Sequence, residues 1–88
     1  MSPKLKPKPK PEDRFCKFLK DGLKVVEDLK NAGNTVNLQV EFNAIAPNFL
    51  FVKNVDKNNV IGKVNNVGPD ITVPCKEIFD NYVDLQIN

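Results

Sequence analysis

The sequence predicts an α+β domain, in which one N-terminal helix is followed by a five-stranded antiparallel sheet that is strongly bent or closed into a small barrel. Two observations carry this prediction. Apolar residues recur at three- and four-residue steps over residues 12–31, and the apolar period changes to two from residue 35 onward. Short turn-forming segments separate the later apolar runs, which favours a helix segregated from an antiparallel sheet. We therefore expect residues 12–88 to form a single domain.

Residues 1–11 (MSPKLKPKPKP) precede this domain and alternate lysine with proline. Proline removes amide donors and favours extended backbone, and the like charges repel one another, so we expect a disordered, solvated arm. The arm lacks the apolar segment of a secretory signal. Two roles stay open for it, contact with an anionic partner or solubilisation alone.

The helix is predicted over residues 12–31. Pro11 fits the first helical position, where a missing N–H costs nothing, and Gly33 is placed to end the helix in the left-handed conformation. Gly22 lies on the apolar stripe of this helix, so we expect close packing against the sheet there. The other members of the stripe are Phe15, Phe18, Leu19, Val26 and Leu29.

Five strands are predicted at residues 35–42, 49–55, 60–67, 71–75 and 82–87, with one helical turn at 76–81. Residues 56–59 (DKNN) are predicted to form the hairpin turn between the second and third strands. Gly62 marks a bend, a bulge or a close approach of two backbones. In the last strand, the alternation predicts that Val83, Leu85 and Ile87 face the core.

The later part of the chain resembles the Sm-like family of Sm, LSm and Hfq proteins over residues 50–88. NNVIGKV is similar to the bent second strand of these proteins, with Gly62 as the glycine at the bend. ITVPCKEI, at residues 71–78, is similar to the segment that leads through a short helical turn into the last strand. The resemblance implies an SH3-like small barrel, assembly into a ring and binding of RNA.

Composition narrows the chemistry that the chain can perform. It has no histidine, which excludes Ser–His and Cys–His catalysis and imidazole metal ligands. Cys16 and Cys75 fall on apolar faces and are predicted to be buried reduced thiols, with a disulfide between them as the alternative. No apolar run approaches the ~20 residues of a membrane span. We therefore predict a cytoplasmic, non-enzymatic binding protein that needs no metal and no cofactor.

The net charge of +2 is unevenly distributed along the chain. Residues 1–11 carry four lysines and no acid, whereas residues 12–88 carry nine basic residues against eleven acidic ones. The folded part is therefore expected to carry a charge of −2. Its overall charge gives no indication of a polyanionic partner.

The candidate binding residues surround the second hairpin and are Phe49, Phe51, Lys53, Lys57, Asn59 and Lys63. Lysines can contact phosphates, aromatic rings can stack on bases and asparagines can read base edges, so RNA binding by an Sm-like ring oligomer is the alternative function. Three other features favour a protein-interaction or assembly module of the adaptor or small-inhibitor type, which self-associates, and this is the function we predict first. These features are the acidic body, the apolar segment at residues 49–51 and the expected free strand edges. Binding of a small ligand at a subunit interface stays open as a third possibility.

Overall fold

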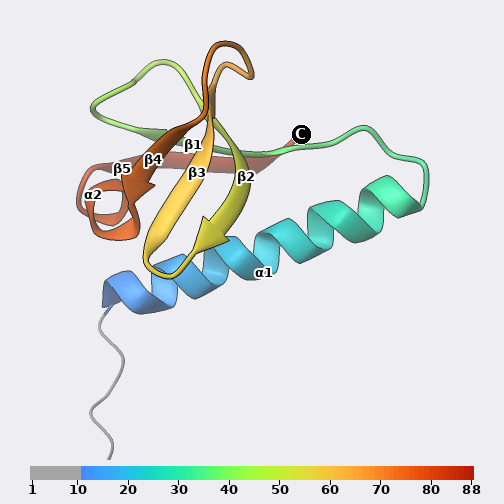
Figure 1. Ribbon diagram of the computed structural model, residues 1–88, viewed down its shortest axis with the longest axis horizontal. Helices are drawn as coiled ribbons and strands as arrows, with labels where there is room; N and C mark the ends of the chain where they lie inside the picture. Colours follow the sequence, from blue (N-terminus) through green and yellow to red (C-terminus); the bar gives the residue numbers. More distant parts are fainter. Residues whose placement is uncertain (1–10) are drawn as a thin grey trace, which may run out of the picture.

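A computed structural model describes residues 11–88 as one long helix, five strands and one short helix (Figure 1). In chain order they are α1 (Pro11–Asn31), β1 (Leu38–Phe42), β2 (Leu50–Asp56), β3 (Asn59–Val64), β4 (Ile71–Pro74), α2 (Cys75–Asp80) and β5 (Tyr82–Ile87). The predicted α+β class and the predicted order of elements are confirmed. The predicted arm lies outside the described residues, apart from Pro11, which begins α1.

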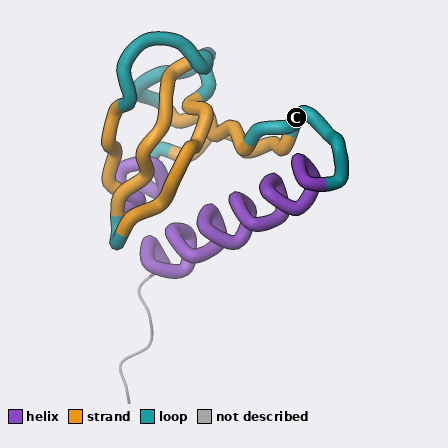
Figure 2. The backbone as a smooth tube through the Cα atoms, turned by 45° about the vertical axis from the view of Figure 1, so that its right-hand side comes forward, coloured by secondary structure: helices purple, strands orange, loops and turns teal. Residues whose placement is uncertain are grey.

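The strands form one sheet in the order β4-β3-β2-β1-β5, and each neighbouring pair is antiparallel. The sheet bends over α1 but does not close into a barrel (Figure 2). Within residues 11–88, β4 pairs only with β3 and β5 only with β1, so each keeps one free edge. An N-terminal helix followed by five antiparallel strands in this order is compatible with the Sm-like topology.

Helix α1 packs one side against the sheet and ends as the sequence predicts. Leu19 and Val26 are buried on that side. At the C-terminal end, Gly33 has a φ of 96° and its N–H donates to the carbonyl of Lys30, while the N–H of Asn34 donates to that of Leu29. This pair of hydrogen bonds is the Schellman arrangement, which satisfies the last carbonyl groups of a helix.

At Gly62 the backbones of β2 and β3 approach closely. The register between these strands shifts between Val52 and Asn54, so Lys53 is an extra residue in β2. A Cβ atom on Gly62 would overlap the carbonyl oxygen of Phe51. The close approach predicted at Gly62 is therefore confirmed, and it accompanies a bulge in the facing strand.

The core joins α1, α2 and one face of the sheet, and its largest fully buried side chains are Phe42, Leu19, Leu38, Leu50, Ile78, Val40 and Val60. Cys16 of α1 and Cys75 of α2 are buried in this core and form a disulfide, with their Cα atoms 5.5 Å apart. The prediction of reduced thiols is therefore wrong. Each cysteine occupies the apolar face that the sequence indicated, but the two faces meet across 59 residues of sequence, and only the tertiary fold reveals that contact.

Strand β5 is less buried than its alternation predicts. Leu85 packs against the core, but Val83 is 46% exposed and Ile87 is 41% exposed. The predicted burial of these two residues is therefore wrong, although Ile87 lies directly opposite the buried Leu38 and so stands on the core face of the sheet as predicted. The physical reason is that β5 is the last strand of an open sheet and its register against β1 shifts between Glu41 and Phe42, so neighbouring elements cover it incompletely.

Three strands are shorter than predicted, and one of them, β4, ends at Pro74 instead of residue 75. Strand β1 begins at Leu38 instead of residue 35, and β3 ends at Val64 instead of residue 67. Asn65 and Asn66 have φ values of 54° and 60°, which place both in the left-handed region and end the ladder. Asparagine tolerates this region better than most residues, so the pair acts as a turn.

Candidate functional site

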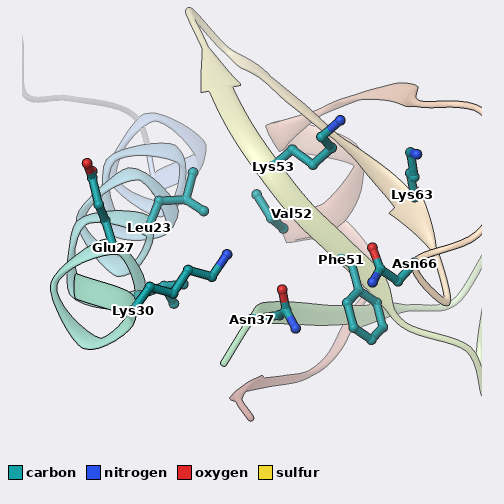
Figure 3. A pocket seen from close by; sticks show the side chains of 10 residues that line it. Leu23, Glu27, Lys30, Asn37, Phe51, Val52, Lys53, Lys63 and Asn66 are labelled. Carbon is teal, nitrogen blue, oxygen red and sulfur yellow. The ribbon is translucent and has the colours of Figure 1, made fainter. Parts of the chain in front are cut away.

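A cleft of about 440 Å³ lies between the C-terminal half of α1 and the middle of the sheet (Figure 3). We call it the lysine cleft, because three lysines contribute to its walls. Its lining residues are Leu23, Val26, Glu27, Lys30, Asn37, Phe51, Val52, Lys53, Lys63 and Asn66.

The wall from α1 is set by the helical period. Leu23, Glu27 and Lys30 are spaced by four and three residues, so they share one side of the helix. In Figure 3 the Lys30 side chain extends from α1 toward the sheet. Val26 is only 4% exposed and closes the base of the cleft on this side.

The wall from the sheet is set by the pairing of β2 with β3. Phe51 lies directly opposite Lys63 in the antiparallel register, so both side chains stand on the same face of the sheet. Lys53 is the extra residue of the bulge in β2. Phe51 and Lys63 are both half-buried, in contrast to the exposed Lys53.

The lining is positively charged although the folded body is acidic. Three lysines against one glutamate give the cleft a net charge of +2. Lys53 is neutralised by Asp70, since its Nζ lies 3.2 Å from a carboxylate oxygen of Asp70. Among residues 11–88, neither Lys30 nor Lys63 makes an ion pair. The lining therefore contains two lysines without an ion-pair partner among these residues, Lys30 from α1 and Lys63 from β3.

The structure brings together three of the six predicted binding residues, Phe51, Lys53 and Lys63. The other three, Phe49, Lys57 and Asn59, lie outside the cleft. Phe49 precedes β2, and its backbone N–H donates to Asn65 Oδ1 while its carbonyl accepts from the Asn65 N–H. Lys57 and Asn59 lie at the turn between β2 and β3, four and six residues beyond Lys53.

That turn is beside the disulfide rather than the cleft. The Lys57 carbonyl oxygen lies 3.4 Å from Cys16 Sγ, and the Asn58 carbonyl accepts a hydrogen bond from the Cys75 N–H. Because a disulfide sulfur carries no hydrogen, the contact with Cys16 is a van der Waals contact. Lys57 and Asn59 are thus placed by packing at the other end of the hairpin.

Sequence reasoning missed the contributions of α1 and of the segment before β1. Lys30 is seven residues after Leu23, so the helical period would place it at the edge of the apolar stripe, and this signal was available. Asn37 had no comparable signal. Its position depends on reciprocal backbone hydrogen bonds with Asn88, which join the start of β1 to the end of β5.

A second surface lies on the other side of α1, away from the lysine cleft. We call it the α1–β5 flank and define it by five exposed apolar side chains, Phe18, Val25, Tyr82, Val83 and Ile87, which are 41–56% exposed. A Cβ atom on Gly22 would meet the side chain of Leu38 in β1, and β5 is the next strand beyond β1. Around the helix axis, Phe18 and Val25 lie on the side of Gly22 that is away from the lysine cleft, so they face the β5 side.

An aromatic cluster joins α1 to β5 at one end of this flank. The Phe15 ring lies 5.7 Å from that of Phe79 and 5.8 Å from that of Tyr82, in tilted and edge-on arrangements. Such geometries are favourable for aromatic pairs. The flank therefore rests on a fixed contact between the helix and the edge strand.

Comparisons with family models, curated proteins and solved structures found no match to this chain. In the part of the chain that the structure describes, no three cysteine, aspartate or glutamate side chains gather as a metal ion would require. Neither helix of residues 11–88 has the length and the apolar character needed to cross a bilayer.

Proposed function

We propose that the protein is a non-enzymatic protein-interaction or assembly module that binds its partner through the α1–β5 flank. The observation that carries this proposal is the exposure of apolar side chains beside a free strand edge. Phe18 is 56% exposed and Val25 is 48% exposed on the helix, and three more apolar side chains are exposed on β5. Exposed apolar patches of this kind are typical of interaction sites.

The free edge of β5 supplies the directional part of the interaction. Its backbone N–H and C=O groups on the side away from β1 have no strand partner among residues 11–88. An added strand would satisfy these groups, while Phe18 and Val25 would be buried by the same partner. Hydrogen bonds would fix the register and apolar burial would supply most of the free energy.

We infer that a second copy of the chain is one partner for this flank. A small domain buries a limited fraction of its surface, so self-association would add apolar burial that the monomer lacks. The free edges of β4 and β5 stand at opposite ends of the same sheet. Two copies could therefore pair through their strand edges, either β5 with β5, β4 with β4, or β4 of one copy with β5 of the other.

The test is light scattering of the full chain over a concentration series. Phe18→Glu combined with Val25→Glu is expected to raise the dissociation constant of the assembly by about tenfold or more, because a buried apolar side chain contributes ~1.5–3 kcal/mol. Val67→Glu is the matched control, since Val67 is 69% exposed in the loop between β3 and β4.

Two outcomes would contradict this proposal. A wild-type chain that stays monomeric at all concentrations would exclude self-assembly. Equal loss of assembly in the flank variant and in the Val67 variant would exclude the flank as the interface.

The second candidate is an Sm-like RNA-binding protein that acts as a ring oligomer. The specific observation in its favour is the strand order β4-β3-β2-β1-β5 behind an N-terminal helix, together with Lys53 and Lys63 at the same cleft. Such a protein would form rings of defined subunit number, which light scattering would reveal.

Single-stranded RNA binding in a salt series separates the two candidates. RNA affinity that survives deletion of residues 1–11, and that weakens in the variant with Lys53, Lys57 and Lys63 changed to alanine, would favour the RNA-binding protein. Each lost phosphate contact is expected to reduce the slope of log K against log salt by about 0.7. Affinity that vanishes with the arm alone would assign the RNA binding to non-specific attraction.

A further inference from the structure

We propose that the lysine cleft binds a small amphiphilic anion, meaning an apolar group that carries one carboxylate or phosphate. This site is separate from the proposed interaction surface, because it lies on the opposite side of α1 from the α1–β5 flank.

The cleft has an apolar base that is partly open to solvent. Leu23 and Phe51 are half-buried there, and Val26 and Val52 lie behind them. Phe51 stands on the face of β2 opposite to the core residues Leu50 and Val52, so the fold of the domain does not require an aromatic ring there. A ligand ring or chain placed on Phe51 would remove apolar surface from water on both partners.

Two lysines of the lining are available to the charged head of the ligand. Lys30 comes from α1 and Lys63 from β3, and neither has a carboxylate partner among the described residues. The lining carries more positive than negative side chains, with Glu27 as its one acidic member, so an anion is favoured there over a neutral group. Asn37 and Asn66 stand at the same cleft with side-chain amides that can donate further hydrogen bonds.

The volume of the cleft limits the ligand to a small molecule. Pockets that bind drug-sized ligands span ~300–1,000 Å³, and about 440 Å³ lies in the lower part of this range. The lining combines six polar or charged residues with four apolar ones, so a ligand that fills it must carry both an apolar part and a charged part. We therefore assign the cleft to a compact organic anion.

The test uses phenyl phosphate as the probe, with the full chain followed by amide NMR shifts. Phenol and inorganic phosphate are the two halves of this probe. Because both parts of the cleft contribute, phenyl phosphate is expected to bind about tenfold more tightly than either half. The amide signals that move should belong to residues of the lysine cleft, and the oligomeric state should not change.

Four charge variants, one of them a control, locate the binding. Lys30→Ala and Lys63→Ala are each expected to weaken phenyl phosphate binding by about fivefold, because each removes a charge-assisted contact. Lys24→Ala is the matched control, since Lys24 is an exposed lysine on the same helix outside the cleft. Asp70→Asn should tighten binding about twofold, because it releases Lys53 from its 3.2 Å ion pair.

Three results would overturn the proposal. The first is phenyl phosphate binding no more tightly than inorganic phosphate. The second is phenyl phosphate binding that Lys24→Ala weakens as much as Lys30→Ala does. The third is single-stranded RNA that binds and depends on Lys63 while phenyl phosphate does not bind, since the lysine would then contact a nucleic-acid backbone. Failure of the flank variants to alter assembly would leave this test unaffected.

Discussion

Gly62 shows how one residue can set the spacing of two strands. A side chain there would meet the backbone of β2, since a Cβ atom would overlap the Phe51 carbonyl oxygen and lie 3.1 Å from Val52 Cα. Backbone atoms cannot move aside as the end of a side chain can. The bulge at Lys53 and the position of Phe51 in the lysine cleft therefore both depend on a glycine at this position.

We predict that Gly62→Ala destabilises the protein by about 1–3 kcal/mol, the usual cost of overpacking. Gly22→Ala is the matched control, because a Cβ there would meet only Leu38 side-chain atoms at 3.4 and 3.5 Å. Alanine is favoured over glycine within a helix by ~1 kcal/mol, so this variant should be as stable as wild type or more stable. Urea unfolding measures both changes, and equal destabilisation by the two variants would contradict the argument.

The sequence indicated a close approach at both Gly22 and Gly62, because glycine is unfavourable within a helix or a strand unless a larger side chain would not fit. It could not distinguish the two positions. The cost of a side chain depends on whether backbone or a flexible side chain faces the glycine, and this is known only from the tertiary structure.

At the scale of elements, the periodicity of α1 and of the strands was enough to predict their kind and order. The burial of each strand was harder to predict. Val83, Leu85 and Ile87 alternate as a core-facing set would, yet only Leu85 packs against the core. Alternation describes which residues share a face, whereas burial depends on the element that covers that face, and an edge strand has fewer neighbours.

The candidate site illustrates the same limit. Phe51, Lys53 and Lys63 were predictable as a group because they belong to one hairpin, where sequence distance and spatial distance agree. Lys30 and Asn37 join them only because α1 crosses the sheet beside β2. Lys57 and Asn59 were predicted to join the same site, but the length of the hairpin separates them from it, since each strand residue adds about 3.3 Å.

For the molecule as a whole, the Cys16–Cys75 disulfide is the long-range covalent link that ties α1 to α2. The two cysteines are 4% and 1% exposed, so both sulfurs lie within the core. Disulfides persist in oxidising compartments and are rare in the cytosol. The cytoplasmic location expected from the sequence therefore stays a prediction, and the state of these cysteines in the cell bears directly on it.

We predict that reduction of this disulfide lowers the free energy of unfolding by about 2–4 kcal/mol. A cross-link that spans 59 residues restricts the unfolded chain, and loop-closure entropy gives about 4 kcal/mol as the upper value. Small domains have a total stability of only ~5–15 kcal/mol, so the loss should be large in thermal and urea unfolding. The paired variant Cys16→Ala with Cys75→Ala should be destabilised in the same direction, and reductant should have no further effect on it.

Thiol alkylation followed by mass spectrometry supplies the control for this prediction. In protein purified without reductant and then unfolded, neither cysteine should react with the alkylating reagent, and after reduction both should react. Full alkylation without reductant would mean that the thiols are free in the isolated protein. In that case reductant should leave the unfolding curve of the wild type unchanged, and packing of α1 and α2 against the sheet would maintain their contact without a covalent link.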